Sequence, residues 1–345
     1  MKRRSVYFTG PGEVAVVKEA IPTPAPGEAL VETTVSAISP GTEMLFYRGE
    51  LPPGVAVDTS IASLSGGLVY PLKYGYACVG RVIGLGAGVS GEWNERLVFA
   101  FHPHESHFCV PVASLLPVPL GIEAERAALL PNAETAVNLV MDGGPLVGER
   151  VVVFGLGVVG LLTTALLAQF PLAALYTVDP IAPRRGVAAS LGATETFDPT
   201  ETESLATALA ESNGADLIFE LSGQPAALDQ AVQMAGFGAR VIVGSWYGNK
   251  RASLDLGEHF HRNRLQIVSS QVSTVAPHLT GRWTKARRMQ SAWRFLADLP
   301  IERLITQRFS VEEAAAAYQL IDRQPGQTVQ VILQYQNKPE LAGKE

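Results

Sequence analysis

The stretch VVVFGLGVVG, residues 151–160, decides the fold of this chain. Gly155, Gly157 and Gly160 stand in the spacing G-x-G-x-x-G, after an apolar run typical of a strand and at the start of a run typical of a helix. There the first glycine permits a tight turn, the second leaves room for a pyrophosphate against bare backbone, and the third allows close packing of helix on strand. The N-terminus of the helix offers free N–H groups to that phosphate. The motif predicts a dinucleotide site; the alternative is a tight turn without a ligand.

A carboxylate follows at the end of the next predicted strand. Asp179 lies 24 residues after Gly155, where its two oxygens can accept hydrogen bonds from both hydroxyls of a ribose. This favours NAD, because the 2′-phosphate of NADP would meet the negative charge of Asp179. Arg184 and Arg185 stand just beyond and would partly reverse that preference, so the sequence leaves NADP open.

Residues 133–271 alternate between strand-like and helix-like runs on both sides of the glycine motif. RVVVFG, ALYTVD, ADLIFELSG, ARVIVGS and LQIVSSQ are nearly continuous apolar runs, as expected for parallel strands covered on both faces. The runs between them have helical character, as in VVGLLTTALLAQF and PAALDQAVQMA. This alternation predicts an α/β domain with a doubly wound parallel sheet.

The remainder of the chain has another character. Residues 1–132 are rich in proline and glycine and contain short strand-like runs such as ALVETTVSAI, and residues 46–74 form a long irregular insertion of the kind that covers sites. Residues 272–345 contain two helix-like runs and a strand-like TVQVILQY that is expected to rejoin the first part; Ser310 and Glu313 predict a capping box before the second helix. We therefore predict one β-rich domain, from 1–132 and 272–345, and one dinucleotide-binding domain over 133–271.

Composition excludes several classes of protein. The 345 residues carry 27 Lys and Arg against 33 Asp and Glu, a net charge of −6. A mild negative charge does not attract nucleic acid or an anionic membrane. Two cysteines cannot build a disulfide framework or a four-cysteine zinc site, and they suit a reducing cytoplasm. The N-terminus lacks the apolar run of a signal peptide, and the longest apolar run is broken by glycines, so we expect a cytoplasmic protein without a membrane span.

The segment FHPHESHFC, residues 101–109, concentrates three histidines and a cysteine, all of them metal-ligand types. If it is a strand, His102 and His104 share one face while His107 and Cys109 are offset, which makes half a metal site. The sequence leaves three interpretations of the histidines open. They form a new metal site, they line a substrate pocket, or they are ordinary surface or core residues. His104 is the candidate for an acid or base near pH 7.

The chain resembles the medium-chain dehydrogenase/reductase superfamily over nearly its whole length. The resemblance rests on a β-rich first part, a Rossmann domain and a C-terminal return strand. The resemblance implies a GroES-like catalytic domain beside the Rossmann domain. It also places Pro40 of VSAISPGTE where the superfamily has a zinc-binding cysteine, Tyr76 and Ala77 of YGYACVGRV where it has His and Glu, and Asn132 near a further ligand position. Proline and alanine have no donor atom, and a neutral phenol or amide binds zinc poorly, so the usual zinc site is not expected.

Four segments, KYGYACVG, PNAETAVN, GSWYG and SSQVSTVAP, are similar to the zinc-lacking branch that includes bacteriochlorophyllide a dehydrogenase. That type of enzyme oxidises a secondary alcohol on a large ring side chain to a ketone. The resemblance therefore implies a small-molecule substrate, bulky or cyclic, without identifying it, and it implies a homodimer.

The resemblance also suggests roles for single residues. Thr42 matches the hydroxyl relay position and Tyr76 the lost histidine ligand, although Thr42 also suits a turn and Tyr76 also suits an aromatic filler of the vacated zinc cavity. Thr135 aligns with the residue that packs on the nicotinamide. Ser222, Ser245 and Ser269 follow predicted strand ends, where ligands of such sheets bind, and groups around the last two are expected to receive the carboxamide.

The sequence thus predicts a zinc-independent NAD(P)-dependent oxidoreductase that interconverts a secondary alcohol and a ketone by hydride transfer. Two alternatives stay open. One is a quinone or enone reductase, which Asp179 disfavours because such enzymes prefer NADPH. The other is a non-catalytic NAD(H)-binding sensor, which would bind the cofactor without turnover.

Overall fold

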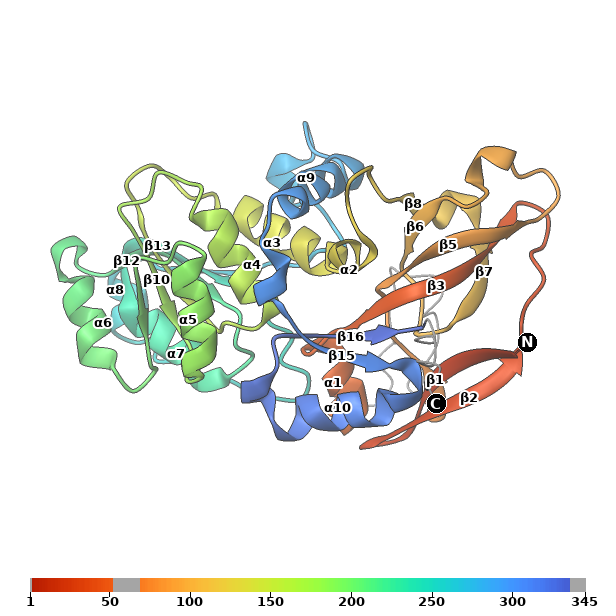
Figure 1. The fold of residues 1–345 in the computed structure, drawn as a ribbon. Helices are drawn as coiled ribbons and strands as arrows, with labels where there is room; N and C mark the ends of the chain where they lie inside the picture. The colour runs from red at the N-terminus through yellow and green to blue at the C-terminus, as the bar shows by residue number, and fades with distance from the viewer. Residues whose placement is uncertain (1, 52–68, 336–345) are drawn as a thin grey trace, which may run out of the picture. The chain divides into compact units, whose positions relative to one another are not determined.

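The computed structural model describes residues 2–51 and 69–335 (Figure 1). The chain divides into two compact units, one built from residues 1–130 and 305–345 and the other from residues 131–304. The first is rich in β-strands and the second contains a parallel sheet with helices, which confirms the predicted α/β fold class.

The unit of residues 131–304 is built on a six-stranded sheet in the order β11-β10-β9-β12-β13-β14, with every neighbouring pair parallel. The chain moves outward from β9 in both directions, and right-handed crossovers then place helices on opposite faces of the sheet. The strands are β9 (Arg150–Phe154), β10 (Ala174–Val178), β11 (Glu195–Phe197), β12 (Ala215–Glu220), β13 (Ala235–Val243) and β14 (Gln266–Ser269). The helices are α3 (Leu130–Gly143), α4 (Val158–Leu167), α5 (Ala182–Ser190), α6 (Thr202–Ala208), α7 (Pro225–Met234), α8 (His259–Arg262) and α9 (Lys285–Ala297).

The central strands of this sheet are buried on both sides. In β9, Val151, Val152 and Val153 have no exposed surface, and in β12 neither do Leu217 and Phe219. Continuous burial explains why these strands read as unbroken apolar runs in the sequence. Each predicted strand and helix of residues 150–269 is present, and the structure adds the short β11, α6 and α8, which the sequence analysis did not foresee.

In the other unit, the described residues form two sheets. One has the order β2-β1-β4; the other has the order β15-β16-β3-β5-β6-β8, with β7 also paired to β3. Its strands are β1 (Lys2–Gly10), β2 (Glu13–Ala20), β3 (Glu28–Ile38), β4 (Leu72–Lys73), β5 (Cys78–Leu85), β6 (Leu97–Ala100), β7 (His107–Pro111), β8 (Leu116–Pro117), β15 (Ile305–Ser310) and β16 (Gln330–Gln334). Its helices are α1 (Thr42–Arg48), α2 (Ala124–Ala127) and α10 (Ala314–Arg323).

The return strand was predicted correctly, because β16 pairs antiparallel with β3 of the N-terminal part. The predicted capping box is also present: the Ser310 side chain and the Glu313 side chain each bond the other's backbone before α10. Helix α1 was not foreseen. Only its last three residues fall in the predicted irregular segment 46–74. The helix buries its apolar side chains in the core of this unit, together with Tyr318 of α10.

Two further expectations concern segment limits. Residues 272–304, which the sequence analysis joined to the β-rich domain, lie in the unit of residues 131–304. Of the predicted insertion 46–74, residues 52–68 lie outside the described residues. Within the ranges 2–51 and 69–335, no helix combines the length and apolar character that crossing a membrane requires.

Candidate functional site

The glycine motif forms the turn between β9 and α4, and its three glycines differ in what surrounds them. Gly155 has φ +90°, and a Cβ there would lie 2.5 Å from the backbone nitrogen of Ser222. A Cβ on Gly160 would lie 1.9 Å from the carbonyl oxygen of Gly155. Both positions therefore require glycine for the protein's own packing.

Gly157 has no such constraint. Its φ of −65° suits any residue, and a Cβ there would meet no atom within 4 Å. It stands at the N-cap of α4, whose first N–H groups have no partner inside the helix. The open space above Gly157, next to these donors, fits the pyrophosphate of a dinucleotide.

Asp179 directly follows β10 and lies against the same loop. One of its oxygens accepts a hydrogen bond from the N–H of Leu156 at 2.7 Å, and the other accepts one from the N–H of Ile181 at 2.8 Å. Arg184 approaches the carboxylate at 4.0 Å; burial lowers the pKa of this arginine, and Asp179 opposes that shift. The structure thus brings together the glycine motif, the predicted ribose ligand and Arg184, as the sequence spacing suggested.

Polar groups gather where β12 and β13 end. Glu220 has no exposed surface, and its carboxylate accepts hydrogen bonds from the N–H of Ser222 at 2.8 Å and from the Tyr247 hydroxyl at 2.6 Å. Burial and the neighbouring carboxylate raise the pKa of Tyr247. The N–H of Gly223 donates to the Ser245 hydroxyl at 2.9 Å. Sequence analysis placed Ser222 and Ser245 at strand ends but missed that a buried glutamate connects this region to Tyr247.

Ser269 is the last residue of β14 and is exposed. A hollow of about 410 Å³ adjoins it, lined by Leu228, Val243, Tyr247, Lys250, Ala252, Ile267 and Ser269. Thr135, on α3, donates its hydroxyl proton to the carbonyl of Pro131 at 2.8 Å and stays partly exposed. Both residues keep surface available for a ligand.

Thr42 and Glu43 open α1 in the β-rich unit. The N–H of Thr42 donates to the Ser39 hydroxyl at 3.3 Å, and Glu43 accepts from the N–H of Ser39 at 2.8 Å. This reciprocal pairing stabilises the turn that presents Thr42, which is partly exposed while Glu43 is fully buried.

His104 lies inside the same unit, with no exposed side-chain surface. Its Nδ1 is 2.7 Å from the Ser36 hydroxyl and its Nε2 is 3.0 Å from Glu43. The Tyr318 hydroxyl donates to the same Glu43 oxygen at 2.5 Å. The predicted acid/base residue thus has both nitrogens engaged in a buried network, which sequence analysis could not find because its members lie far apart in the chain.

Tyr76, the third predicted catalytic residue, is partly buried. Its ring stands perpendicular to that of Tyr74, with the ring centroids 6.2 Å apart. Gly75 between them has φ +113°, and a Cβ there would lie 2.5 Å from the His104 ring. The glycine thus lets the histidine approach the backbone that carries Tyr76.

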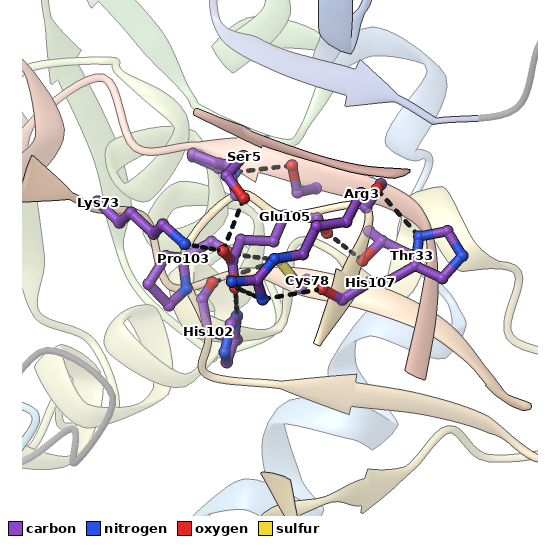
Figure 2. A network of polar contacts seen from close by, with 12 residues as sticks. Arg3, Ser5, Thr33, Lys73, Cys78, His102, Pro103, Glu105 and His107 are labelled. Carbon is purple, nitrogen blue, oxygen red and sulfur yellow. Dashed lines mark hydrogen bonds and ion pairs between the residues drawn. The ribbon is translucent and has the colours of Figure 1, made fainter. Parts of the chain in front are cut away.

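The segment 101–109 is not one strand, so the alternation considered for its histidines was wrong. Pro103 interrupts it, and β7 starts only at His107. Figure 2 shows what holds the segment: Glu105, 3% exposed, receives hydrogen bonds from Ser5 at 2.8 Å and from Lys73. Burial lowers the pKa of His102 to about 4, although Glu105 opposes the shift, so His102 is neutral at pH 7.

A zinc ion requires about four suitable donors in tetrahedral arrangement. In residues 2–51 and 69–335, no three His, Cys, Asp or Glu side chains are grouped so that they could hold a metal ion. Pro40 and Ala77 contribute no donor, and Glu43 is already engaged by His104 and Tyr318. The position where the resemblance expects a zinc-binding cysteine thus carries a side chain without a donor atom, Pro40.

Comparison with known sequences shows similarity to dehydrogenases. Residues 158–292 match the family model described as zinc-binding dehydrogenase. L-threonine 3-dehydrogenase of Bacillus licheniformis is 29% identical over 232 residues, 65% of this chain and 62% of that protein. D-guloside 3-dehydrogenase of Escherichia coli is 26% identical over 267 residues, 75% of this chain and 76% of that protein.

Solved structures share the fold. A 2R,3R-butanediol dehydrogenase from Bacillus subtilis superposes with a TM-score of 0.79 at 17% identity, covering 97% of this chain and 100% of that one. A short chain alcohol dehydrogenase from E. coli CFT073, in complex with NADH, has a TM-score of 0.78 at 20% identity, covering 97% and 99%. These comparisons show that the chain is similar in sequence to dehydrogenases, that residues 158–292 match the zinc-binding dehydrogenase model, and that the solved dehydrogenases share its fold.

Proposed function

We propose that the protein is a zinc-independent NAD(P)-dependent oxidoreductase that interconverts a secondary alcohol and a ketone. The observation that carries the proposal is the glycine turn: Gly157 faces open space at the N-terminus of α4, and Asp179 lies against the same loop. The similarity to dehydrogenases supports it, and so do related folds solved with NADH and with NADP.

The cofactor would be held by residues of the unit 131–304. The N–H groups at the start of α4 would bind the pyrophosphate, and Asp179 would accept the ribose hydroxyls. Thr135, Ser222, Ser245 and Ser269 would contact the nicotinamide end. When bound, the nicotinamide supplies the hydride acceptor.

The proton of the substrate alcohol requires a group that can reach solvent or substrate. Thr42 and Tyr76 keep exposed surface, whereas His104 is enclosed with both nitrogens engaged. We therefore assign direct proton exchange to Thr42 or Tyr76, and to His104 an indirect part through Glu43. Zinc independence is supported by the donor-poor residues at the usual ligand positions.

The proposal is tested by measuring NAD(P)H formation from a panel of secondary alcohols that includes bulky cyclic ones, together with the zinc content of the protein. We expect turnover that survives EDTA, less than stoichiometric zinc, and a loss of about tenfold or more in kcat for Thr42→Val if the hydroxyl moves the proton. Stoichiometric zinc would refute zinc independence, and unchanged kcat would remove Thr42 from catalysis. Activity only on conjugated acceptors would identify a quinone or enone reductase. Cofactor binding without turnover of any substrate would identify a non-catalytic NAD(H)-binding sensor.

Asp179→Ser is expected to weaken NAD binding about tenfold or more while NADP binding changes little, because charge-assisted hydrogen bonds to the ribose are lost but no phosphate contact is. Titration of both cofactors by fluorescence or calorimetry measures this. Asp198→Ser is the matched control, since Asp198 likewise follows a strand of the sheet, β11, and pairs with an arginine, Arg185, at 3.1 Å. An equal loss for NAD and NADP would contradict the assignment of Asp179 to the ribose.

The homodimer and the cytoplasmic location expected from the sequence stay predictions. Size-exclusion chromatography with light scattering would measure the first, and a mass of one chain would contradict it.

A further inference from the structure

Arg288, on the second turn of α9, is a buried cation outside the residues discussed so far. Its side chain is 1% exposed. A guanidinium has five N–H donors, and burying it is costly unless they are matched. Here Nε and Nη2 donate to one oxygen of Glu134 at 3.1 and 2.8 Å, and Nη1 donates to the carbonyl of Thr274 at 2.8 Å.

The other two donors complete the set. Nη1 also donates to the side-chain oxygen of Asn138 at 2.5 Å, and Nη2 to the carbonyl of Val272. The guanidinium therefore connects three segments of the unit 131–304: helix α9, helix α3, and the stretch that follows β14. A lysine could not do this, because it has three donors at a single point.

The contacts extend along α3. Asn138 donates from its amide nitrogen to the hydroxyl of Ser270 at 3.0 Å and to Asp142 at 2.9 Å, and Ser270 donates to Asp142 at 2.6 Å. Glu134, Asn138 and Asp142 are spaced i, i+4, i+8, so they form one polar stripe of the helix. This stripe faces the stretch 270–274, which directly follows Ser269.

The two segments joined in this way carry predicted cofactor contacts. Thr135 is next to Glu134 on α3, and Ser269 is next to Ser270 at the end of β14. Burial raises the pKa of Glu134, and the Arg288 guanidinium opposes that shift. The two charges are therefore buried together, and removing either one would leave the other buried without a charged partner.

We propose that Arg288 is a positioning residue. By joining α3 to the stretch after β14, it fixes the positions of the residues that would bind the nicotinamide half of the cofactor. The inference rests on the proposed function and deepens it. Arg288 touches no cofactor group in this role. It acts through Thr135 and Ser269. Ser269 ends β14, which lies three strands from β9 in the sheet, and the adenosine half would bind at the turn after β9.

The test compares dissociation constants for NADH and for ADP-ribose, which lacks the nicotinamide. The variant is Arg288→Met combined with Glu134→Gln, which removes both charges and avoids a buried unpaired carboxylate. We expect the dissociation constant for NADH to rise about tenfold or more, since several hydrogen bonds that order the segment are lost, while that for ADP-ribose stays within about twofold. Arg287→Met is the control, because Arg287 is exposed on the same helix and lies 4.1 Å over the Trp283 ring.

Unchanged NADH binding, or equal losses for NADH and ADP-ribose, would overturn the positioning role, the latter because a general loss of structure weakens both ligands alike. If the double variant does not fold, Arg288→Lys, which retains the charge, is measured instead. It should lose affinity for NADH and keep its affinity for ADP-ribose, as expected of the double variant. If the unaltered protein binds neither ligand, the proposed function fails instead, so the two failures are distinguishable.

Discussion

Gly157→Val is expected to lower the affinity for NADH about 100-fold or more while the midpoint of thermal unfolding stays unchanged. The side chain would enter the open space above the turn and displace the pyrophosphate from the N–H groups at the start of α4. Two charge-assisted hydrogen bonds, each worth about 1.5–3 kcal/mol, account for a loss of this size. Calorimetric titration with NADH and thermal unfolding by circular dichroism measure the two quantities on the same sample.

Two other glycines serve as controls. Gly186→Ala, on α5, also adds a Cβ where no atom lies within 4 Å and should bind NADH normally. Gly160→Ala should lose stability, because its Cβ would meet the Gly155 carbonyl oxygen at 1.9 Å. Normal NADH binding by the Gly157→Val protein would show that no dinucleotide lies on this turn and would remove the main support for the proposed function.

Glu43→Leu is expected to lower the free energy of unfolding by about 3 kcal/mol or more, because it strands several buried polar groups at once. The change removes the acceptor of the Tyr318 hydroxyl, the partner of His104 Nε2 and the acceptor of the Ser39 N–H. Each unsatisfied buried group costs about 1–3 kcal/mol. Urea unfolding followed by fluorescence measures the difference, with the slope of the transition checked for two-state behaviour.

Tyr318→Phe is the matched control for this network. It removes one hydrogen bond to Glu43 but leaves the carboxylate its two other partners, so a loss of about 1 kcal/mol is expected. Should Glu43→Leu cost no more than Tyr318→Phe, the network around His104 would not stabilise the β-rich unit, and the indirect part assigned to His104 would lose its basis.

Much of the unit 131–304 could be predicted because its signals are local. A run such as Val151–Phe154 followed by Gly155, Gly157 and Gly160 specifies a strand, a tight turn and a helix within a dozen residues. Asp179 could be placed beside the glycine turn because parallel strands end on the same edge of the sheet. The poor donor set at Pro40, Tyr76 and Ala77 was predicted from the resemblance, which supplies the ligand positions, together with the residue types found there.

Three features required the tertiary structure. His104 meets Glu43 from a segment 61 residues away, and Arg288 meets Glu134 from 154 residues away. Neither pairing leaves a periodic or spaced pattern in the chain, since a buried charge is satisfied by whichever acceptors folding brings near it. Residues 272–304 belong to the unit 131–304, and Arg288 of this segment donates hydrogen bonds to Glu134 and Asn138 of α3.

The sequence by itself therefore determined the parallel sheet and the glycine turn between β9 and α4. Short-range sterics and hydrophobic periodicity act there within a few residues, so the pattern can be read directly. Only the tertiary structure decided which polar side chains are buried and with whom, because desolvation and hydrogen bonding depend on contacts between residues distant in the chain.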